Sequence, residues 1–249
     1  MRFFLLILTF STCATLAQQP TAEKPKKWAI GLSYSPDFCY RVSYEKSSLS
    51  ALSNIDEKGK LGFTAGANIL YQLLDKVGIE FGILYNTKGE KMHAEAFSWN
   101  AGSMNYDPSL PNNGLNGNII TPERKINFSY QYLEIPLKIN AYLISKNKLK
   151  LFPSIGCSAN IFMGKKTATT FIFDDGHKEK NVSHEYDRKN IPGSEFALLV
   201  GVGASYDLSE RLFVKLEPSF RTFIRPLVDS PISGTFYSLG ANAGIYLKF

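Results

Sequence analysis

The feature that most constrains the fold is an alternation of apolar and polar side chains with a period of two residues. It recurs in eight segments, the last of which ends at Phe249. In KWAIGLSYS, for example, Trp28, Ile30 and Leu32 fall on one face, and small residues lie between them. Successive side chains of a β-strand point to opposite faces, so this period is typical of strands. Eight such segments predict an all-β protein.

The connections between the segments alternate between short and long. Short turns follow the second, fourth and sixth segments, near Asp75, Asn147 and Ser209. Long connections follow the other segments, over residues 36–58, 87–125, 164–192 and 226–234. An antiparallel up-and-down order therefore places every short turn at one end and every long loop at the other, with both termini at the short-turn end. This is the plan of an outer-membrane barrel.

The glycines within the segments identify the inner face. They share the polar parity, at Gly31, Gly62, Gly66, Gly78, Gly82, Gly156, Gly201, Gly203, Gly240 and Gly244. Closing eight strands leaves an interior barely wide enough for side chains, so small residues belong on the inner wall. Leucine, isoleucine and valine then face outward, which is stable only in lipid. The sequence predicts an eight-stranded antiparallel up-and-down transmembrane β-barrel of the outer-membrane type.

Three prolines interrupt the alternation inside segments that otherwise read as strands. Pro136, Pro153 and Pro218 each lack the N–H group that a closed ladder uses, and we expect bulges or kinks at these positions.

Charged residues of both signs share the inner parity with the glycines. A charge away from bulk water is costly unless it is paired, so we expect a salt-bridge network that fills the lumen. We place Glu195 and Arg225 toward the external end and Lys215 and Glu217 lower. A purely structural role and a role in gating or ligand binding both stay open. The predicted network comprises Glu80, Glu134, Lys138, Glu195, Lys215, Glu217, Arg221 and Arg225.

The N-terminus has the pattern of a secretory signal peptide. Arg2 is followed by an apolar run over residues 3–10 and by small residues that end at Ala17. We therefore divide the chain into a signal peptide (1–17), a periplasmic tail (18–26) and an outer-membrane barrel domain (27–249). Cys13 is disfavoured as a lipidation site because Thr12 precedes it. Of the later cysteines, we expect Cys157 on an outward strand face and Cys39 in or near a loop, both as free thiols.

Composition excludes several functional classes. The net charge of +6 is spread over the chain with no basic stripe, so we expect no nucleic-acid partner. The three histidines, His93, His177 and His184, all fall in the long loops. The segment FDDGHKEKNVSHEYDRK could hold a divalent cation or an acid–base pair, but it has no recognised ligand spacing. We interpret it as a solvated loop and expect no metal, no cofactor and no catalytic set.

One strand motif points to a family. The run YLEIPL, from Tyr132 to Leu137 and followed by Lys138, resembles the corresponding strand of the PorT-like outer-membrane β-barrel family. The resemblance implies a small outer-membrane barrel in which Pro136 is expected. The family's named member is associated with type IX protein secretion and gliding, while most of its relatives have no assigned activity.

The last ten residues, GANAGIYLKF, combine two expected roles. As the eighth strand they must pair with the first strand to remove the free edges of the sheet. The set Asn242, Gly244, Leu247 and Phe249 also resembles the C-terminal signal that barrel-assembly machinery recognises.

The sequence thus predicts an integral outer-membrane protein that contacts outer-membrane lipid. Its expected role is structural or interactive, through external loops that bind envelope or secretion-system proteins. A narrow small-solute channel and, less favoured, an enzyme at the barrel rim are the alternatives.

Overall fold

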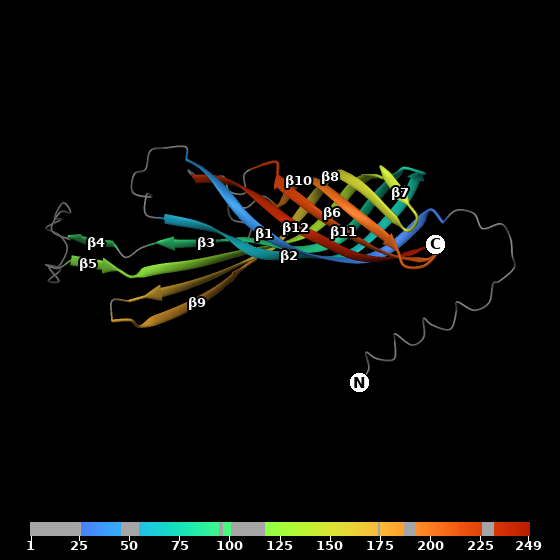
Figure 1. The fold of residues 1–249 in the computed structure, drawn as a ribbon. Helices are drawn as coiled ribbons and strands as arrows, with labels where there is room; N and C mark the ends of the chain where they lie inside the picture. Colours follow the sequence, from blue (N-terminus) through green and yellow to red (C-terminus); the bar gives the residue numbers. More distant parts are fainter. Residues whose placement is uncertain are drawn as a thin grey trace, which may run out of the picture.

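The computed structural model describes residues 26–45, 55–94, 97–100, 118–173, 175–186, 193–225 and 232–249. All regular structure in these ranges is β-strand. Figure 1 shows the strands side by side in a twisted wall, with the C-terminus at one end of it. In the described ranges there is accordingly no helix long and apolar enough to cross a membrane.

Eight strands close into a ring, and each is antiparallel to its two neighbours. The last strand pairs with the first, from Ala29 opposite Lys248 to Glu45 opposite Ile232. This confirms the predicted antiparallel barrel. In ring order the strands are β1 (Trp28–Glu45), β2 (Ile55–Leu74), β3 (Val77–Ala94), β6 (Glu123–Ala141), β8 (Leu149–Ile172), β10 (Ser194–Asp207), β11 (Leu212–Phe223) and β12 (Ile232–Lys248).

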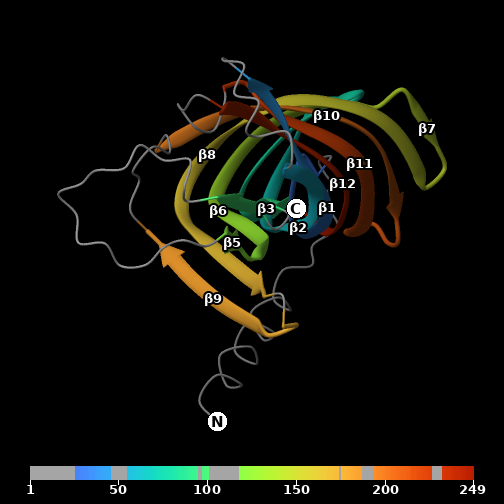
Figure 2. The ribbon, with the colours of Figure 1, turned by 90° about the vertical axis from the view of Figure 1, so that its left-hand side faces the viewer.

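Four shorter strands lie outside the ring. β4 (Phe97–Asn100) and β5 (Asn118–Thr121) form a separate two-stranded sheet. β7 (Ile144–Lys146) pairs with the start of β8, and β9 (Lys178–Glu185) pairs with its end. Figures 1 and 2 show that β9 extends the wall beyond the ring at the end opposite the C-terminus.

The short turns lie where the sequence predicts them. Asp75 and Lys76 join β2 to β3, and residues 208–211 join β10 to β11. In the turn between β7 and β8, Asn147 has a positive φ of 54°, a conformation that asparagine tolerates better than most residues.

The strands continue further at the external end than the sequence predicts. β1 runs through Pro36 to Glu45, β3 runs to Ala94, and β8 runs to Ile172. The expected loops over residues 36–58, 87–125 and 164–192 are therefore partly strand, and β12 already begins at Ile232. The alternation continues beyond the expected end of the first segment, since Phe38 and Val42 are exposed while Asp37 and Cys39 are buried. Cys39 accordingly lies in β1 rather than in or near a loop.

The three strand prolines cause no bulge. The register shifts of the ladder lie at Gly59/Phe63, Gln72/Leu74 and Gln131/Tyr132 instead. Pro136 and Pro218 lie in register opposite Ser158 and Ala241. The expectation of bulges there is wrong, because a missing N–H removes one ladder bond without adding a residue to the strand. The ladder to one neighbour is interrupted at Pro136 and at Pro218, and the register is the same on both sides of each gap.

The two faces of the wall differ as predicted. Leu32, Ile83 and Val202 are more than half exposed on the outside, whereas Glu80 and Asn140 are fully buried inside. The inner glycines leave space for rings. A Cβ atom on Gly203 would overlap the ring of Phe152, and one on Gly31 would overlap Tyr246.

Aromatic pairs mark both edges of the apolar outer surface. At the short-turn end, the rings of Trp28 and Tyr71 lie 4.5 Å apart. Toward the long-loop end, the rings of Tyr40 and Tyr237 lie 5.4 Å apart. Rings at these two levels suit the headgroup regions of a bilayer.

Candidate functional site: the charged lumen

Four charged side chains form the centre of the lumen. Lys215 Nζ contacts both Glu80 and Glu217, the latter at 2.8 Å. Lys138 Nζ lies 3.0 Å from Glu217 and 3.3 Å from Glu80. Opposite charges therefore alternate around the cluster. β3 and β11 are four places apart in the eight-strand ring, so the Glu80–Lys215 pair crosses the full width of the lumen.

Neutral groups complete the coordination of the two carboxylates. Asn140 Nδ2 donates to Glu80 Oε2 over 3.0 Å, and Tyr246 Oη donates to Glu80 Oε1 over 3.2 Å. Ser154 Oγ donates to Glu217 Oε1. Buried ion pairs are tolerated when the remaining lone pairs are also satisfied, and this cluster meets that condition.

A second ion pair lies nearer the external end. Arg221 Nη1 on β11 contacts both carboxylate oxygens of Asp37 on β1 at 2.8 Å. Ser35 Oγ and Thr64 Oγ1 also donate to this carboxylate. The pair spans β12, where Gly240 leaves space for it, since a Cβ atom there would overlap Asp37 Oδ1.

Further polar groups fill the lumen beside these pairs. Asn86 Nδ2 donates to Glu134 Oε2 over 2.6 Å and to Asn160 Oδ1 over 3.0 Å. Lys88 Nζ donates to Ser238 Oγ over 3.3 Å and lies 5.1 Å from the centre of the Phe223 ring.

Arg41 and Glu90 form another inner ion pair. Arg41 Nε lies 2.8 Å from a carboxylate oxygen of Glu90, and the Glu90 side chain is almost fully buried. This pair extends the charged interior into the part of the barrel that the sequence assigns to loops.

Aromatic rings close the external half. The buried cluster places the rings of Tyr132 and Phe223 5.6 Å apart in an edge-to-face contact, a favoured geometry for ring pairs. The cluster consists of Tyr130, Tyr132, Phe162, Ala197, Phe223 and Phe236.

Little free volume remains among these groups. A cavity lined by Glu134, Glu217 and Arg221 measures about 10 Å³. That is at the lower limit for holding a single water molecule.

The structure brings together most residues of the predicted network. Glu80, Lys138, Lys215 and Glu217 form the central cluster, with Glu134 and Arg221 beside it. Glu195 is also buried, near the external end of β10, but its carboxylate has no hydrogen-bond partner among the described residues.

Arg225 is not on the inner wall. β11 ends at Phe223, and Arg225 lies in the following bend with an exposed side chain. Its charge still acts on the buried carboxylate of Glu195, so the place of Arg225 in the network stays a prediction.

Sequence reasoning missed four inner charges. Asp37, Arg41, Lys88 and Glu90 all lie in segments assigned to long loops. The signal was present, because Asp37, Cys39 and Arg41 continue the inner parity of β1 beyond Pro36.

The C-terminal residues form the seam of the barrel. Asn242 and Gly244 face inward, whereas Leu247 and Phe249 are exposed on the outside. The Phe249 N–H donates to the Trp28 carbonyl over 2.8 Å, which links the last residue to the first strand. Lys248 Nζ also lies 2.6 Å from Asp207.

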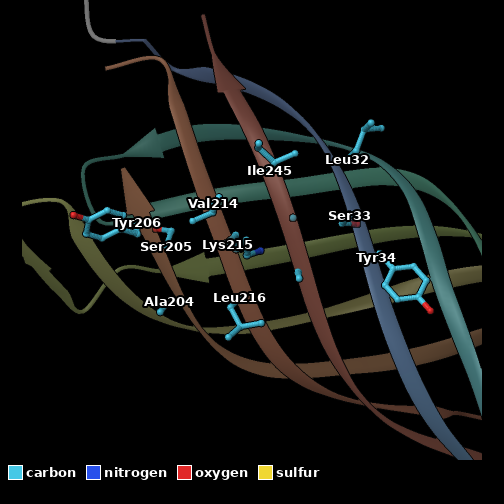
Figure 3. Close-up of a pocket in the computed structure, with 12 residues that line it drawn as sticks. Leu32, Ser33, Tyr34, Ala204, Ser205, Tyr206, Val214, Lys215, Leu216 and Ile245 are labelled. Atoms are coloured by element: carbon cyan, nitrogen blue, oxygen red, sulfur yellow. The ribbon is translucent and has the colours of Figure 1, made fainter. Parts of the chain in front are cut away.

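A groove of about 610 Å³ lies across the seam on the outer wall. Figure 3 shows Leu32 and Tyr34 on β1, Ile245 on β12 and Leu216 on β11 at its sides. Ala204 and Ala243 also line it, and its surface is almost entirely apolar. The apolar side chains that line it lie in the lipid-facing zone.

The histidine-containing segment forms the β8–β9 hairpin. His177 Nε2 lies 3.6 Å from Glu179, and both side chains are mostly exposed. Asp174 and Asp187 lie outside the described residues. Within the described ranges, no group of three or more His, Cys, Asp or Glu side chains is arranged to hold a metal ion.

The ring of antiparallel strands, the apolar outer surface and the polar interior define an integral outer-membrane β-barrel protein. The family described as outer membrane protein beta-barrel domain matches residues 17–223. The chain belongs to this family.

Solved structures resemble the chain at low identity. Neisserial surface protein A is 13% identical, with a TM-score of 0.41, and the match covers 89% of this chain and 97% of that one. OprG from Pseudomonas aeruginosa is 11% identical, with a TM-score of 0.42 and coverage of 90% and 97%. The protease OmpT from Escherichia coli is 13% identical, with a TM-score of 0.44 and coverage of 94% and 100%. A comparison with curated protein sequences found no match.

Proposed function

We propose that this protein is a PorT-like barrel that acts through protein contacts at its external end and does not conduct solutes. The single observation that carries the proposal is the crossing of the lumen by the Glu80–Lys215 pair, which is joined by Lys138 and Glu217. In a barrel filled in this way, the interior side chains stabilise the fold. Partners would then be bound by the strands and loops beyond the membrane.

The external part of the wall offers the surface for such contacts. Every residue of β9 is exposed, and β9 pairs with β8 along one side only among the described strands. Val182 and Tyr186 place apolar groups there, with exposed fractions of 41% and 73%. An accessory role in protein secretion is one form of this function, and it rests on the resemblance of residues 132–137 to the PorT-like motif.

The proposal includes the route to the membrane. The signal peptide (1–17) would direct export and leave a periplasmic tail (18–26) before the barrel (27–249). The leader lies outside the described residues. The barrel-assembly machinery would recognise the C-terminal strand through Asn242, Gly244, Leu247 and Phe249.

Conductance tests the closed lumen. The purified, folded protein is reconstituted into planar bilayers, and we expect no steady current above the membrane leak. The folded state is checked by its heat-dependent shift in gel mobility. A steady, reproducible conductance would overturn the proposal and support the small-solute channel.

Site-specific crosslinking tests the external contacts. A photo-crosslinking amino acid is placed at Val182 or Tyr186, and the control position is lipid-facing Val202, whose side chain is 66% exposed. We expect a discrete envelope protein to crosslink from β9 in native membranes and not from Val202. Equal patterns from all three positions would contradict an external interaction site.

A further inference from the structure

The outer face of the wall changes character just above the lipid zone. On β2, Leu61 is 72% exposed, and its neighbour toward the external end of the strand is Lys60. On β8, Met163 is 49% exposed, and Lys166 follows three residues later with an exposed side chain. Apolar groups and lysines are thus neighbours at the boundary where a bilayer has its headgroups.

Lys60 lies in the irregular part of β2 between Gly59 and Phe63, and its side chain crosses the neighbouring strand β3. A Cβ atom on Gly89 of β3 would lie 3.1 Å from Lys60 Cδ, so the missing side chain leaves the path open. Lys60 Nζ reaches β6, where it donates to the Phe128 carbonyl over 3.1 Å and to Ser129 Oγ. The lysine therefore holds its ammonium group over the centre of the β3–β6 pair.

Two more lysines lie around the same point. Gly89 pairs with Ser129, and Ser129 pairs with Lys166 on β8. Lys91 lies two residues beyond Gly89 on the same face of β3, and its side chain is exposed. Lys91 on β3 and Lys166 on β8 are therefore near Lys60, and the charges of both act on its ammonium group.

These three charges have no acidic partner in the part of the chain that the structure describes. By contrast, Lys125 lies on the same face of β6 and sits 3.0 Å from Glu123, which also accepts a 2.8 Å contact from His93. Like charges gathered without counter-charges destabilise a sheet surface. Such a cluster is favourable when an anion lies among them.

We propose that Lys60, Lys91 and Lys166 form a binding site for the phosphate groups of outer-leaflet lipid headgroups. Ammonium groups donate strong hydrogen bonds to phosphate oxygens, and three from different strands can hold one phosphate from several sides. A lipid is the occupant that fits, because its acyl chains would lie against Leu61 and Met163 while its phosphate meets the lysines. A soluble anion would gain nothing from these apolar neighbours.

Binding of a phosphorylated lipid tests the proposal. The full-length protein is folded in a non-ionic detergent, and its affinity for diphosphoryl lipid A is measured in mixed micelles. The triple variant Lys60→Gln, Lys91→Gln, Lys166→Gln should bind about tenfold or more weakly, because each lost cation removes an attraction to the anionic headgroup.

Lys125→Gln is the matched control, and it should change the affinity by less than about twofold. Hydrogen bonds from Lys125 and His93 lower the pKa of Glu123, so this carboxylate is ionised at neutral pH and already neutralises Lys125. Equal loss in the control and the triple variant would show general surface attraction and overturn the site.

Two further arms identify the phosphate and its source. Dephosphorylated lipid A should bind the wild type and the triple variant alike. Inorganic phosphate at millimolar concentration should not displace lipid A, and displacement would overturn the assignment to lipid.

Lys166→Glu removes an exposed side chain from the cluster without touching the Lys60 contacts, so it tests the site even if the triple variant fails to fold. Unchanged lipid A affinity in Lys166→Glu would overturn the proposal.

Discussion

Arg221 Nη1 lies 2.8 Å from each carboxylate oxygen of Asp37, although the two residues are 184 positions apart in the chain. Arg221 is on β11 and Asp37 is on β1, so the contact spans β12, the strand that closes the barrel. Gly240 on β12 leaves the space that the Asp37 carboxylate occupies. The seam is therefore held by a buried ion pair as well as by its backbone ladder.

Asp37→Asn should destabilise the folded barrel. The substitution removes the carboxylate that Arg221 contacts directly, while Glu134 and Glu217 still attract its charge. The loss should therefore lie at or below the about 3–5 kcal/mol that breaking a buried pair costs. The free energy of unfolding is measured by urea titration in lipid vesicles, with tryptophan fluorescence as the readout. Asp75→Asn is the matched control, because Asp75 lies in an exposed turn, and its effect should stay within about 0.5 kcal/mol.

A double substitution distinguishes the energy of the Asp37–Arg221 ion pair from the effect of changing either side chain alone. Adding Arg221→Met to Asp37→Asn removes the cation that has lost its closest partner, so part of the lost stability should return. Strictly additive losses in the double variant would show that the two groups are not coupled in the folded barrel.

Gly203→Val should destabilise the folded barrel by overfilling its interior. A Cβ atom at this inner position overlaps the Phe152 ring, and overpacking of this kind costs about 1–3 kcal/mol. Ala204→Val, one residue along and on the lipid-facing side, should be nearly neutral by the same unfolding assay. Phe152→Ala combined with Gly203→Val should cost less than the sum of the two single changes. An equal loss from Ala204→Val would contradict the assignment of faces.

The part of the fold that could be predicted from sequence is the part that lies in lipid. There the outer face must be apolar and the inner face small or polar, so the alternation is strong, and it located β10 and the central cluster around Lys215. Beyond the lipid the inner face holds aromatic rings as well as charges, so the alternation is weaker although the ladder continues. Lys88 and Glu90 were missed for this reason, whereas Asp37 still follows the inner parity of β1.

Pro36 and Arg225 show the limits of local signals. The expected loop begins at Pro36, but the ladder continues past this residue, which lies opposite Phe63. Arg225 has the inner parity, but β11 ends two residues earlier. Parity predicts the direction of a side chain only while the strand persists, and the strand length depends on pairing partners that one segment does not reveal.

The two cysteines should differ in reactivity in the folded barrel. Cys39 is fully buried inside the wall, while Cys157 is exposed on the outer face of β8. In detergent micelles, N-ethylmaleimide should modify Cys157 and leave Cys39 unmodified until the protein is unfolded. Peptide mass spectrometry identifies the labelled residue, and Cys157→Ser provides the background. Rapid labelling of Cys39 in the folded state would mean that β1 does not run past Pro36 as a barrel strand.

Removal of Phe249 should impair assembly more than stability. The folded barrel would lose one terminal hydrogen bond, from the Phe249 N–H to the Trp28 carbonyl, and an exposed ring, while the β1–β12 ladder from Ala29 to Glu45 stays in place. A single hydrogen bond contributes about 0.5–1.5 kcal/mol, so refolding into vesicles should give a barrel of nearly wild-type stability. In cells, the truncated chain should accumulate at lower levels in the outer membrane, because the proposed assembly signal ends on this ring.

Phe249→Tyr keeps an aromatic ring at the terminus and should restore the level, which quantitative immunoblotting of membrane fractions measures. If the truncated chain reaches wild-type levels, Phe249 is no part of an assembly signal. If it fails to refold in vesicles as well, the ring acts on stability and not on recognition.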